Sequence, residues 1–336
     1  MMDLPDLATL MAFVVAFAVF TYVMLDGFDL GVALLFPLFP ERNDRDVMMN
    51  SVAPVWDGNE TWLVLGGGAL FAAFPLAYAI VMPALYAPLV AMLLGLVFRG
   101  VAFEFRWRTE RGKVLWDVAF AGGSLVASFA QGVALGAILQ GIPVAGRAYA
   151  GGWWDWLTPF SLLCGVAVVA GYALLGATWL VLKTGGALQD RAFALSRILA
   201  WATLGFIGAV SLATPFLEAA YHQNWLAWPR ILLTAPVPLA VAGVAVALLR
   251  SLQARDDGWP FVLTLTLFAL CFVGLGVSMF PFIIPGSVTI WQAAAPDKSL
   301  RFILTGVSVL IPVILAYTGY AYWVFRGKID PEAGYH

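Results

Sequence analysis

Four carboxyl groups of this 336-residue sequence lie inside or directly beside long apolar runs, where they could carry protons. Asp26 and Asp29 stand in "LDGFDLG", and Asp57 and Glu60 stand in "WDGNETWLVLGGG" with Asn59 between them. In each pair the acids are three residues apart, so on a helix they lie on neighbouring faces. An ionised carboxylate in the middle of a bilayer costs about 2.5 to 3.5 kcal/mol, so such residues persist where they pair, protonate or line a wet path.

Two interpretations of these acids stay open. In the first, they pair with arginines and hold helix ends together; the candidate arginines are Arg42, Arg45, Arg99 and Arg106. In the second, they form a protonatable chain that admits protons from the cytoplasm, because burial favours transient protonation of a carboxylate.

The surroundings of each acid favour one interpretation or the other. Asp57 has Asn59 and Glu60 beside it as partners, which favours proton transfer. Both interpretations are equally open for Asp26 and Asp29. Glu104 and Asp117 fall near the predicted ends of apolar runs, where pairing with arginine is the simpler role.

The composition requires that the elements positioning these acids be membrane helices. Apolar residues make up 62% of the chain and charged residues only 11%, and the mean hydropathy is +0.89. Soluble domains carry about 25% charged residues. A net charge of −2 argues against a nucleic-acid partner. The start "MMDLPDLATL" is acidic and has no basic segment, so we expect no cleavable signal peptide.

Nine apolar runs are each long enough to span a bilayer, which takes roughly 20 residues. None shows the short alternation of a membrane β-barrel. We therefore predict an all-α polytopic membrane protein that forms a single integral membrane domain over residues 1–336. The predicted spans are residues 7–38, 52–74, 77–101, 114–140, 156–182, 192–216, 231–249, 261–284 and 303–325.

The distribution of Lys and Arg predicts the orientation of these spans. Of the 18 basic residues, 14 fall in the loops on one side of the predicted bilayer and 4 on the other. The basic side is cytoplasmic by the positive-inside rule. This places the N-terminus outside and the C-terminus in the cytoplasm, and it moves Asp57 and Glu60 into the cytoplasmic half of the second span.

Other residues predict packing. Gln131 and Gln140 are expected to make hydrogen bonds between helices, and the glycines at 66–68 are expected to allow close helix packing. The prolines of "MFPFIIPG" are expected to end the eighth helix.

Histidines and cysteines give little support for a metal centre in this chain. His222 lies in a loop-like stretch and His336 is the last residue, so no predicted span contains a histidine for haem. Cys164 and Cys271 both lie in apolar runs, and two thiols are too few for an iron–sulfur cluster. We expect no redox centre, metal or other cofactor bound by this chain alone.

Three blocks of sequence resemble subunit II of cytochrome bd-type quinol oxidases. They are "DGFDLGVALLFP" from Asp26, "NSVAPVWDGNETWLVLGGGALFAAFPLAYA" from Asn50 and "MFPFIIPGSVTIWQAAA" from Met279. The resemblance covers nearly the whole chain, including the nine-span layout. The compact length and "GNETW" are most similar to the cyanide-insensitive branch.

The resemblance implies a fold of two four-helix bundles plus one peripheral helix. It implies a complex in the bacterial cytoplasmic (inner) membrane that oxidises ubiquinol or menaquinol and reduces dioxygen to water. Two b-type haems and one d-type haem would be held by the partner, subunit I. A structural quinone and a small single-span subunit belong to the complex in part of the family.

The resemblance also assigns roles to individual residues. Asp57 matches a carboxylate on a proton pathway from the cytoplasm toward the haems, and Asp26 and Asp29 match a block near its entry. Trp62 matches a position implicated in an oxygen route from the bilayer. Part of the family has Gln where Glu60 stands, so a relay through Glu60 is not a property of the whole family.

Two other functions stay open beside an oxidase subunit that supplies a proton pathway. A proton-coupled secondary transporter would also contain buried carboxylates, although its sites typically lie at the midplane between repeats. A purely structural subunit would use the same acids only as ion pairs.

Overall fold

The computed structural model describes residues 6–109 and 111–329, so His336 and both ends of the predicted domain lie outside the described residues. Within that part of the chain, eight helical segments are long and apolar enough to cross a membrane. They are α1 (Leu7–Leu35) with the 3₁₀ turn η1 (Phe36–Leu38), α5 (Tyr86–Arg108), α6 (Lys113–Leu139), α7 (Pro159–Lys183), α8 (Gly186–Ala213) with η2 (Thr214–Phe216), α10 and α11 (Ile231–Thr234 and Pro236–Ala254), α12 (Trp259–Met279) and α14 (Asp297–Val324).

The remaining elements are shorter. They are the helices α2 (Arg42–Val52), α3 (Trp56–Ala73), α4 (Pro75–Ala84), α9 (Ala219–Leu226) and α13 (Ile290–Ala293), and the strands β1 (Val144–Ala145), β2 (Ala148–Tyr149), β3 (Phe282–Ile284) and β4 (Val288–Thr289). The strands form two antiparallel hairpins, with β1 paired to β2 and β3 paired to β4.

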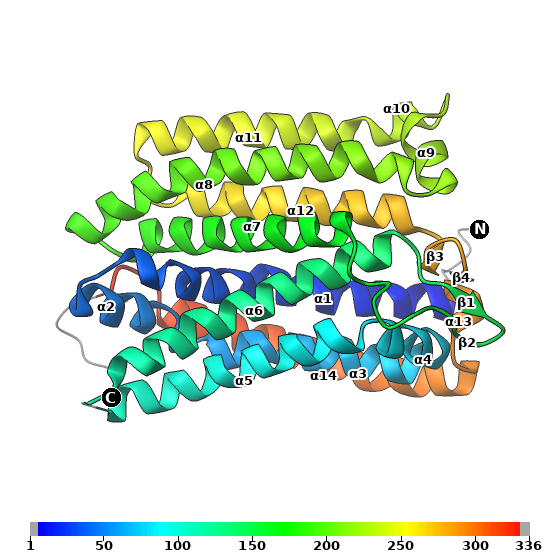
Figure 1. Ribbon diagram of the computed structural model, residues 1–336, viewed down its shortest axis with the longest axis horizontal. Coiled ribbons are helices and arrows are strands. Elements are labelled where there is room, and N and C mark those ends of the chain that lie inside the picture. The colour runs from blue at the N-terminus through cyan, green and yellow to red at the C-terminus, as the bar shows by residue number, and fades with distance from the viewer. Residues whose placement is uncertain (1–5, 110, 330–336) are drawn as a thin grey trace.

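The long helices run side by side, and the start of α1 and the end of α14 lie at opposite ends of the molecule (Figure 1). In that view α7, α8, α11 and α12 occupy the upper half, while α1, α3, α5, α6 and α14 occupy the lower half. Helix α7 contacts both α1 and α6, which joins the halves. We call the end that carries α2 and the α5–α6 turn the basic end, because its loops contain most of the Lys and Arg residues.

The second and third spans differ most from prediction. The second was expected at 52–74, but α3 begins at Trp56, after the separate amphipathic helix α2. The third was expected at 77–101, yet the apolar residues up to Ala84 form the short helix α4, and the long span α5 begins at Tyr86. Pro83 and Pro88 flank that break, and proline cannot donate a helix hydrogen bond. Helix α5 then continues to Arg108. Its arginines Arg99 and Arg106 form buried ion pairs, so these charges do not end the helix.

The third difference concerns α12, which ends at Met279 instead of 284. The prolines of "MFPFIIPG" follow this end, as predicted, and the chain continues into the β3–β4 hairpin. The other spans lie within a few residues of their predicted bounds, with α8 and α14 each beginning six residues earlier.

Close helix packing occurs at glycines other than those predicted. A Cβ on Gly31 of α1 would lie 1.8 Å from the backbone oxygen of Tyr172 in α7, and a Cβ on Gly176 would lie 2.2 Å from the backbone of Gly31. In the "GGG" block, Gly66 packs against Ala18 and Val19 of α1. Gly67 and Gly68 are exposed, and a Cβ at either position would have no neighbouring atom within 4 Å. The prediction for those two glycines is wrong.

Candidate functional site

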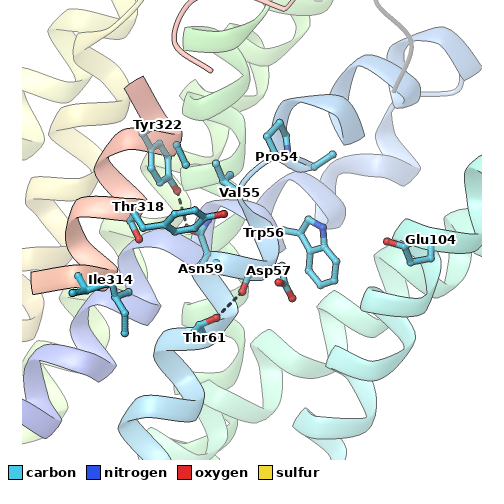
Figure 2. Close-up of a pocket in the computed structure, with 15 residues that line it drawn as sticks. Pro54, Val55, Trp56, Asp57, Asn59, Thr61, Glu104, Ile314, Thr318 and Tyr322 are labelled. Atoms are coloured by element: carbon cyan, nitrogen blue, oxygen red, sulfur yellow. Dashed lines mark hydrogen bonds between the residues drawn. The ribbon is translucent and has the colours of Figure 1, made fainter. Parts of the chain in front are cut away.

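A cavity of about 810 Å³ opens between the start of α3 and the side of α14, toward the basic end. Residues of α3 line one wall, among them Asp57, Asn59 and Thr61, and residues of α14 line the other, among them Tyr317 and Tyr322 (Figure 2). Two segments far apart in the sequence therefore form one cavity that contains both carboxylate and hydroxyl groups.

Asp57 lies on the open side of this cavity. It stands in the first turn of α3, its side chain is exposed, and no ion pair involving it occurs among the described residues. Its backbone oxygen accepts a hydrogen bond from Thr61 Oγ1 at 3.0 Å, as in any helix with a threonine four residues on. The carboxylate itself is free to meet water, a proton donor or a partner chain.

Asn59 connects the cavity to the buried acids of α1. It lines the cavity, is 1% exposed, and donates from Nδ2 to Asp29 Oδ2 at 2.7 Å. On its other side Asn59 Oδ1 accepts a hydrogen bond of 3.0 Å from the Tyr322 hydroxyl of α14. Three helices are therefore linked through one amide.

Asp26 and Arg99 form a fully buried ion pair. The guanidinium of Arg99 donates two hydrogen bonds to the carboxylate, at 2.6 and 3.0 Å, and neither side chain has exposed surface. This paired geometry is the strong form of an arginine–carboxylate contact. For Asp26 the structure thus shows the pairing of the first interpretation, with Arg99 as the partner, while its place on a proton pathway stays a prediction.

Asp29 is buried beside this pair, and it lies farther from Arg99 than Asp26 does. Its Oδ2 lies 3.9 Å from Arg99 Nη2, and its Oδ1 has no hydrogen-bond partner among the described residues. A buried carboxylate oxygen without a donor is costly while the group is ionised. A negative charge on Asp29 is therefore compensated only at Oδ2, by Asn59 and more distantly by Arg99.

Glu60 lies between the cluster and solvent. Its side chain is 26% exposed, and its Oε2 lies 3.8 Å from Arg99 Nη1. Trp56, which lines the cavity, lies over the same guanidinium at 5.9 Å from ring centroid to Cζ. Arg99 thus stands among Asp26, Asp29 and Glu60, on the inner side of Trp56.

Trp62 is not among the residues that line the cavity. It is fully buried in a small apolar cluster with Ala18 and Tyr22 of α1, and its ring meets that of Phe17 edge-on at 5.8 Å. Ile311 and Ile314 of α14 pack against the same cluster. The oxygen route through Trp62 stays a prediction.

A second charged cluster lies nearer the basic end. Arg106 is fully buried and contacts Asp117 at 2.5 Å and Asp46 at 2.6 Å, while Arg45 reaches Asp117 at 2.9 Å. The pairing predicted for Asp117 is therefore confirmed. Glu104 has only an exposed contact of 4.0 Å with Arg108 and lines the cavity instead.

Sequence reasoning missed Tyr322. It lies 263 residues after Asn59 and belongs to a helix end with several aromatic residues, where tyrosine usually serves as an interfacial anchor. No local signal separates it from Tyr317 or Tyr320. The interhelical role predicted for Gln131 is confirmed: it bridges Tyr22 and Tyr172, at 2.8 Å each.

Comparison with known proteins identifies the family. The model of the family "Cytochrome bd terminal oxidase subunit II" matches residues 7–325. Cytochrome bd-I ubiquinol oxidase subunit 2 of Escherichia coli K12 is 35% identical, over 93% of this chain and 92% of its own length. This chain belongs to the cytochrome bd terminal oxidase subunit II family.

Two further comparisons agree with that family. Cytochrome bd ubiquinol oxidase subunit 2 of Bacillus subtilis 168 is 32% identical, over 92% of this chain and 93% of its own. A chain of the bd oxidase structure from Geobacillus thermodenitrificans has the same fold, with a TM-score of 0.75, 17% identity, and coverage of 95% and 98% of the two chains. The chain is thus a multi-pass membrane subunit of a bd-type oxidase.

The family implies haems, whose iron takes axial ligands such as histidine, and the described part of this subunit contains one histidine, His222. Among the described residues, no group of three or more His, Cys, Asp or Glu could hold a metal ion. Cys164 is buried in α7 and packs against the glycines of α6. His222 lies on α9, at the far end from the cavity.

Proposed function

We propose that this chain is the non-haem subunit II of a quinol oxidase, that it passes protons from the cytoplasm toward the haem-bearing subunit I, and that it supports that subunit. The haems, two b-type and one d-type, would carry electrons from quinol to dioxygen within subunit I. This chain's own residues would take up and hold the protons that water formation consumes.

One observation carries the proton role: the cavity joins an exposed acid to a buried one through a single amide. Asp57 lies on the open side, and Asn59 donates to Asp29 on the closed side. Glu60 is partly exposed and offers a second acceptor close to Arg99. The proposed order is Asp57, then Glu60 or cavity water beside Asn59, then Asp29 next to the Asp26–Arg99 pair.

The electrostatics of the cluster support a proton at Asp29. Asp26 already satisfies Arg99, so a charge on Asp29 would leave the buried group of three with one excess negative charge. Coulomb interactions are strong in such surroundings, and protonation removes that excess. Asp29 Oδ1 accepts no hydrogen bond among the described residues, so nothing there stabilises a negative charge on it.

A structural role has its own supporting observation in the pairs Asp26–Arg99 and Asp117–Arg106. Both pairs are buried. Arg99 donates two hydrogen bonds to Asp26, and Asp117 accepts one from Arg106 and one from Arg45, so each acid ties its helix to another. We therefore assign support of the fold to these pairs and proton transfer to Asp57, Glu60, Asn59 and Asp29.

The membrane arrangement follows the same proposal. Helix α3 would be the ninth span, the basic end would face the cytoplasm, and the cavity would open on the side where protons are taken up. The spans would form two four-helix bundles with α14 as the peripheral helix. A structural quinone and a small single-span subunit are further expectations from the family.

The decisive test replaces Asp57 with Asn in the complete complex. We expect quinol-dependent oxygen uptake to fall by about tenfold or more, with haem content unchanged, because proton transfer typically contributes factors of about 10² to 10⁴. The matched control is Glu104→Gln, which removes another exposed carboxylate of the same cavity. Full activity of Asp57→Asn would contradict the proton role and leave the structural one.

A proton-coupled transporter is separated from this proposal by a spectrum. The tagged chain, purified from its native membrane, should bring b- and d-type haem absorbance with it. A haem-free preparation without a large partner subunit would favour transport.

A further inference from the structure

The end of α14 is attached to α7 by a lysine. Lys183 Nζ donates to the backbone oxygens of Phe325 at 2.5 Å and Gly327 at 3.0 Å, and Ile329 N donates back to the Lys183 backbone oxygen at 2.8 Å. The last carbonyls of a helix lack partners within the helix, and a cation there also interacts favourably with the helix dipole. Lys183 therefore caps the end of α14.

This end of α14 buries no residue fully against the rest of the chain. Only Leu300 and Val307 are buried along its 28 residues, and both lie in its first half. The helix packs mainly on α3 and α1. The lysine cap, with an exposed ion pair between Lys328 and Asp257 at 2.8 Å, holds the last turn in register.

The register of that turn places Tyr322. Its ring meets those of Trp179 and Phe28 edge-on, each at 6.4 Å between centroids. Trp179 is also the ring that Lys183 Nζ approaches at 5.2 Å. The cap and Tyr322 therefore contact the same side chain, so a displacement of one end of α14 moves the tyrosine.

Tyr322 in turn sets the orientation of Asn59. An amide has two donor hydrogens and one acceptor oxygen, and this one uses its oxygen for Tyr322 and its nitrogen for Asp29 and the Leu25 backbone oxygen. Without the tyrosine hydroxyl the amide could turn over, and its oxygen would then face the Asp29 carboxyl. Water from the cavity would take the place of the lost hydrogen bond.

We propose that Tyr322 is a gate residue between the open cavity and the buried Asp29, and that Lys183 is the positioning residue that holds it. With α14 capped, the Tyr322–Asn59 hydrogen bond closes the path (Figure 2). A shift of the α14 end breaks this bond and admits water to Asp29. The proposal rests on the proposed function for its purpose, but its geometry can be tested without turnover.

The test measures how readily Asp29 reacts with a water-soluble carbodiimide and an amine, by peptide mass spectrometry of the purified complex. We expect Tyr322→Phe to raise the labelling rate of Asp29 about three- to tenfold, the change in population that one lost hydrogen bond produces. Asp57, which is exposed in every variant, serves as the internal standard. The matched control Tyr317→Phe removes a hydroxyl from the same cavity wall and should leave Asp29 labelling unchanged.

Lys183 variants test the positioning role. Lys183→Met should raise Asp29 labelling as Tyr322→Phe does. Lys183→Arg should label Asp29 at the wild-type rate, because arginine is also a cationic hydrogen-bond donor. The double variant Lys183→Met/Tyr322→Phe should label no faster than the faster single variant. Equal Asp29 labelling in wild type and Tyr322→Phe, or an equal rise in Tyr317→Phe, would overturn the gate. If Lys183→Met does not assemble, the two tyrosine variants decide the gate alone, since neither loses a ring.

The gate and the proton route fail differently. If Tyr322→Phe raises the labelling of Asp29 while Asp57→Asn keeps full oxygen uptake, the gate stands and the route is wrong. If Asp57→Asn loses activity while no variant changes the labelling of Asp29, the route stands and the gate is wrong.

Discussion

Arg99 lies among three carboxyl groups and has no exposed surface, so its replacement affects more than one contact. Its Nε atom has no hydrogen-bond partner among the described residues, and its terminal nitrogens serve Asp26, Asp29 and Glu60. A buried charge that loses its counter-ion is far more costly than the pair was favourable. Arg99 is therefore needed to keep the two acids Asp26 and Asp29 buried in the protein interior.

We predict that Arg99→Gln destabilises the assembled complex by about 3–5 kcal/mol, the cost of breaking a buried pair from one side. The measurement is the yield and thermal stability of haem-containing complex in detergent. Arg108→Gln is the control, because Arg108 is 80% exposed and should change stability by no more than about 0.5 kcal/mol. Adding Asp26→Asn to Arg99→Gln should recover part of the loss, and a further loss would contradict the pairing.

The sequence was sufficient to identify the acids, but it could not show which of them is paired with arginine and which is not. Residue spacing placed Asp26 beside Asp29 and Asp57 beside Glu60, because i, i+3 neighbours follow from helix geometry alone. Which acid takes Arg99 depends on how α1, α3 and α5 are rotated, and a count of charges contains no such information. The structure gives the buried site to Asp29 and leaves Asp57 at the open side.

At the scale of elements, the contact of α1 with α7 depends on glycine. Gly31 and Gly176 face one another so closely that a Cβ on either meets backbone atoms, which cannot move aside as a side chain can. Small residues allow membrane helices to approach in this way. Both Asp29 and Trp179 lie within about one turn of this contact, so it also fixes the distance between the acid and the lysine cap.

We expect Gly31→Ala to separate α1 from α7 and to lower the amount of assembled complex severalfold, since forced overpacking costs about 1–3 kcal/mol. Gly67→Ala is the matched control in α3, because nothing lies within 4 Å of its built Cβ. Haem absorbance per amount of membrane protein measures the effect. Equal assembly of the two variants would show that the contact relaxes freely.

The C-terminal segment offers a prediction on pH. The pKa of Asp257 is lowered, chiefly by the hydrogen bond from Lys328, so the folded group ionises more readily than the unfolded one. Its contribution is present above the unfolded value of 3.8 and is lost as pH falls through the folded pKa. Asp257→Asn should therefore speed proteolytic removal of the C-terminal segment to a similar, modest extent at pH 7 and pH 5. An effect confined to pH 7 would contradict this assignment.

Helix boundaries show where sequence reasoning reached its limit. The runs predicted for α6 and α7 match the observed helices to within three residues, because lipid selects long apolar segments, whereas α14 begins six residues before its predicted start. The sequence analysis misplaced α5. Its charged residues seemed to end the span, but Arg99 and Arg106 form ion pairs inside the molecule, so the helix continues past them. A hydropathy scale gives every arginine the same unfavourable value, whether or not it forms an ion pair inside the protein.

At the scale of the whole molecule, the distribution of basic residues gives a direct prediction of topology. A green fluorescent protein fused after Lys328 should fluoresce in cells, because that protein matures in the cytoplasm. Alkaline phosphatase fused at the same point should be inactive. The reverse pattern would turn the molecule over in the membrane and place the cavity, with Asp57, on the outer face.

The hydrogen bond between Asn59 and Tyr322 also has a consequence for biosynthesis. The two residues are 263 positions apart, so α1 and α3 enter the membrane long before their partner on α14 has been translated. Trp291, whose indole donates to Asp6 at the start of α1, is likewise made near the end of synthesis. In the nascent chain, Asn59 and the Asp29 beside it therefore lack the hydrogen bond from Tyr322 until α14 has been made. The final seventh of the polypeptide thus completes a structure that the first fifth began.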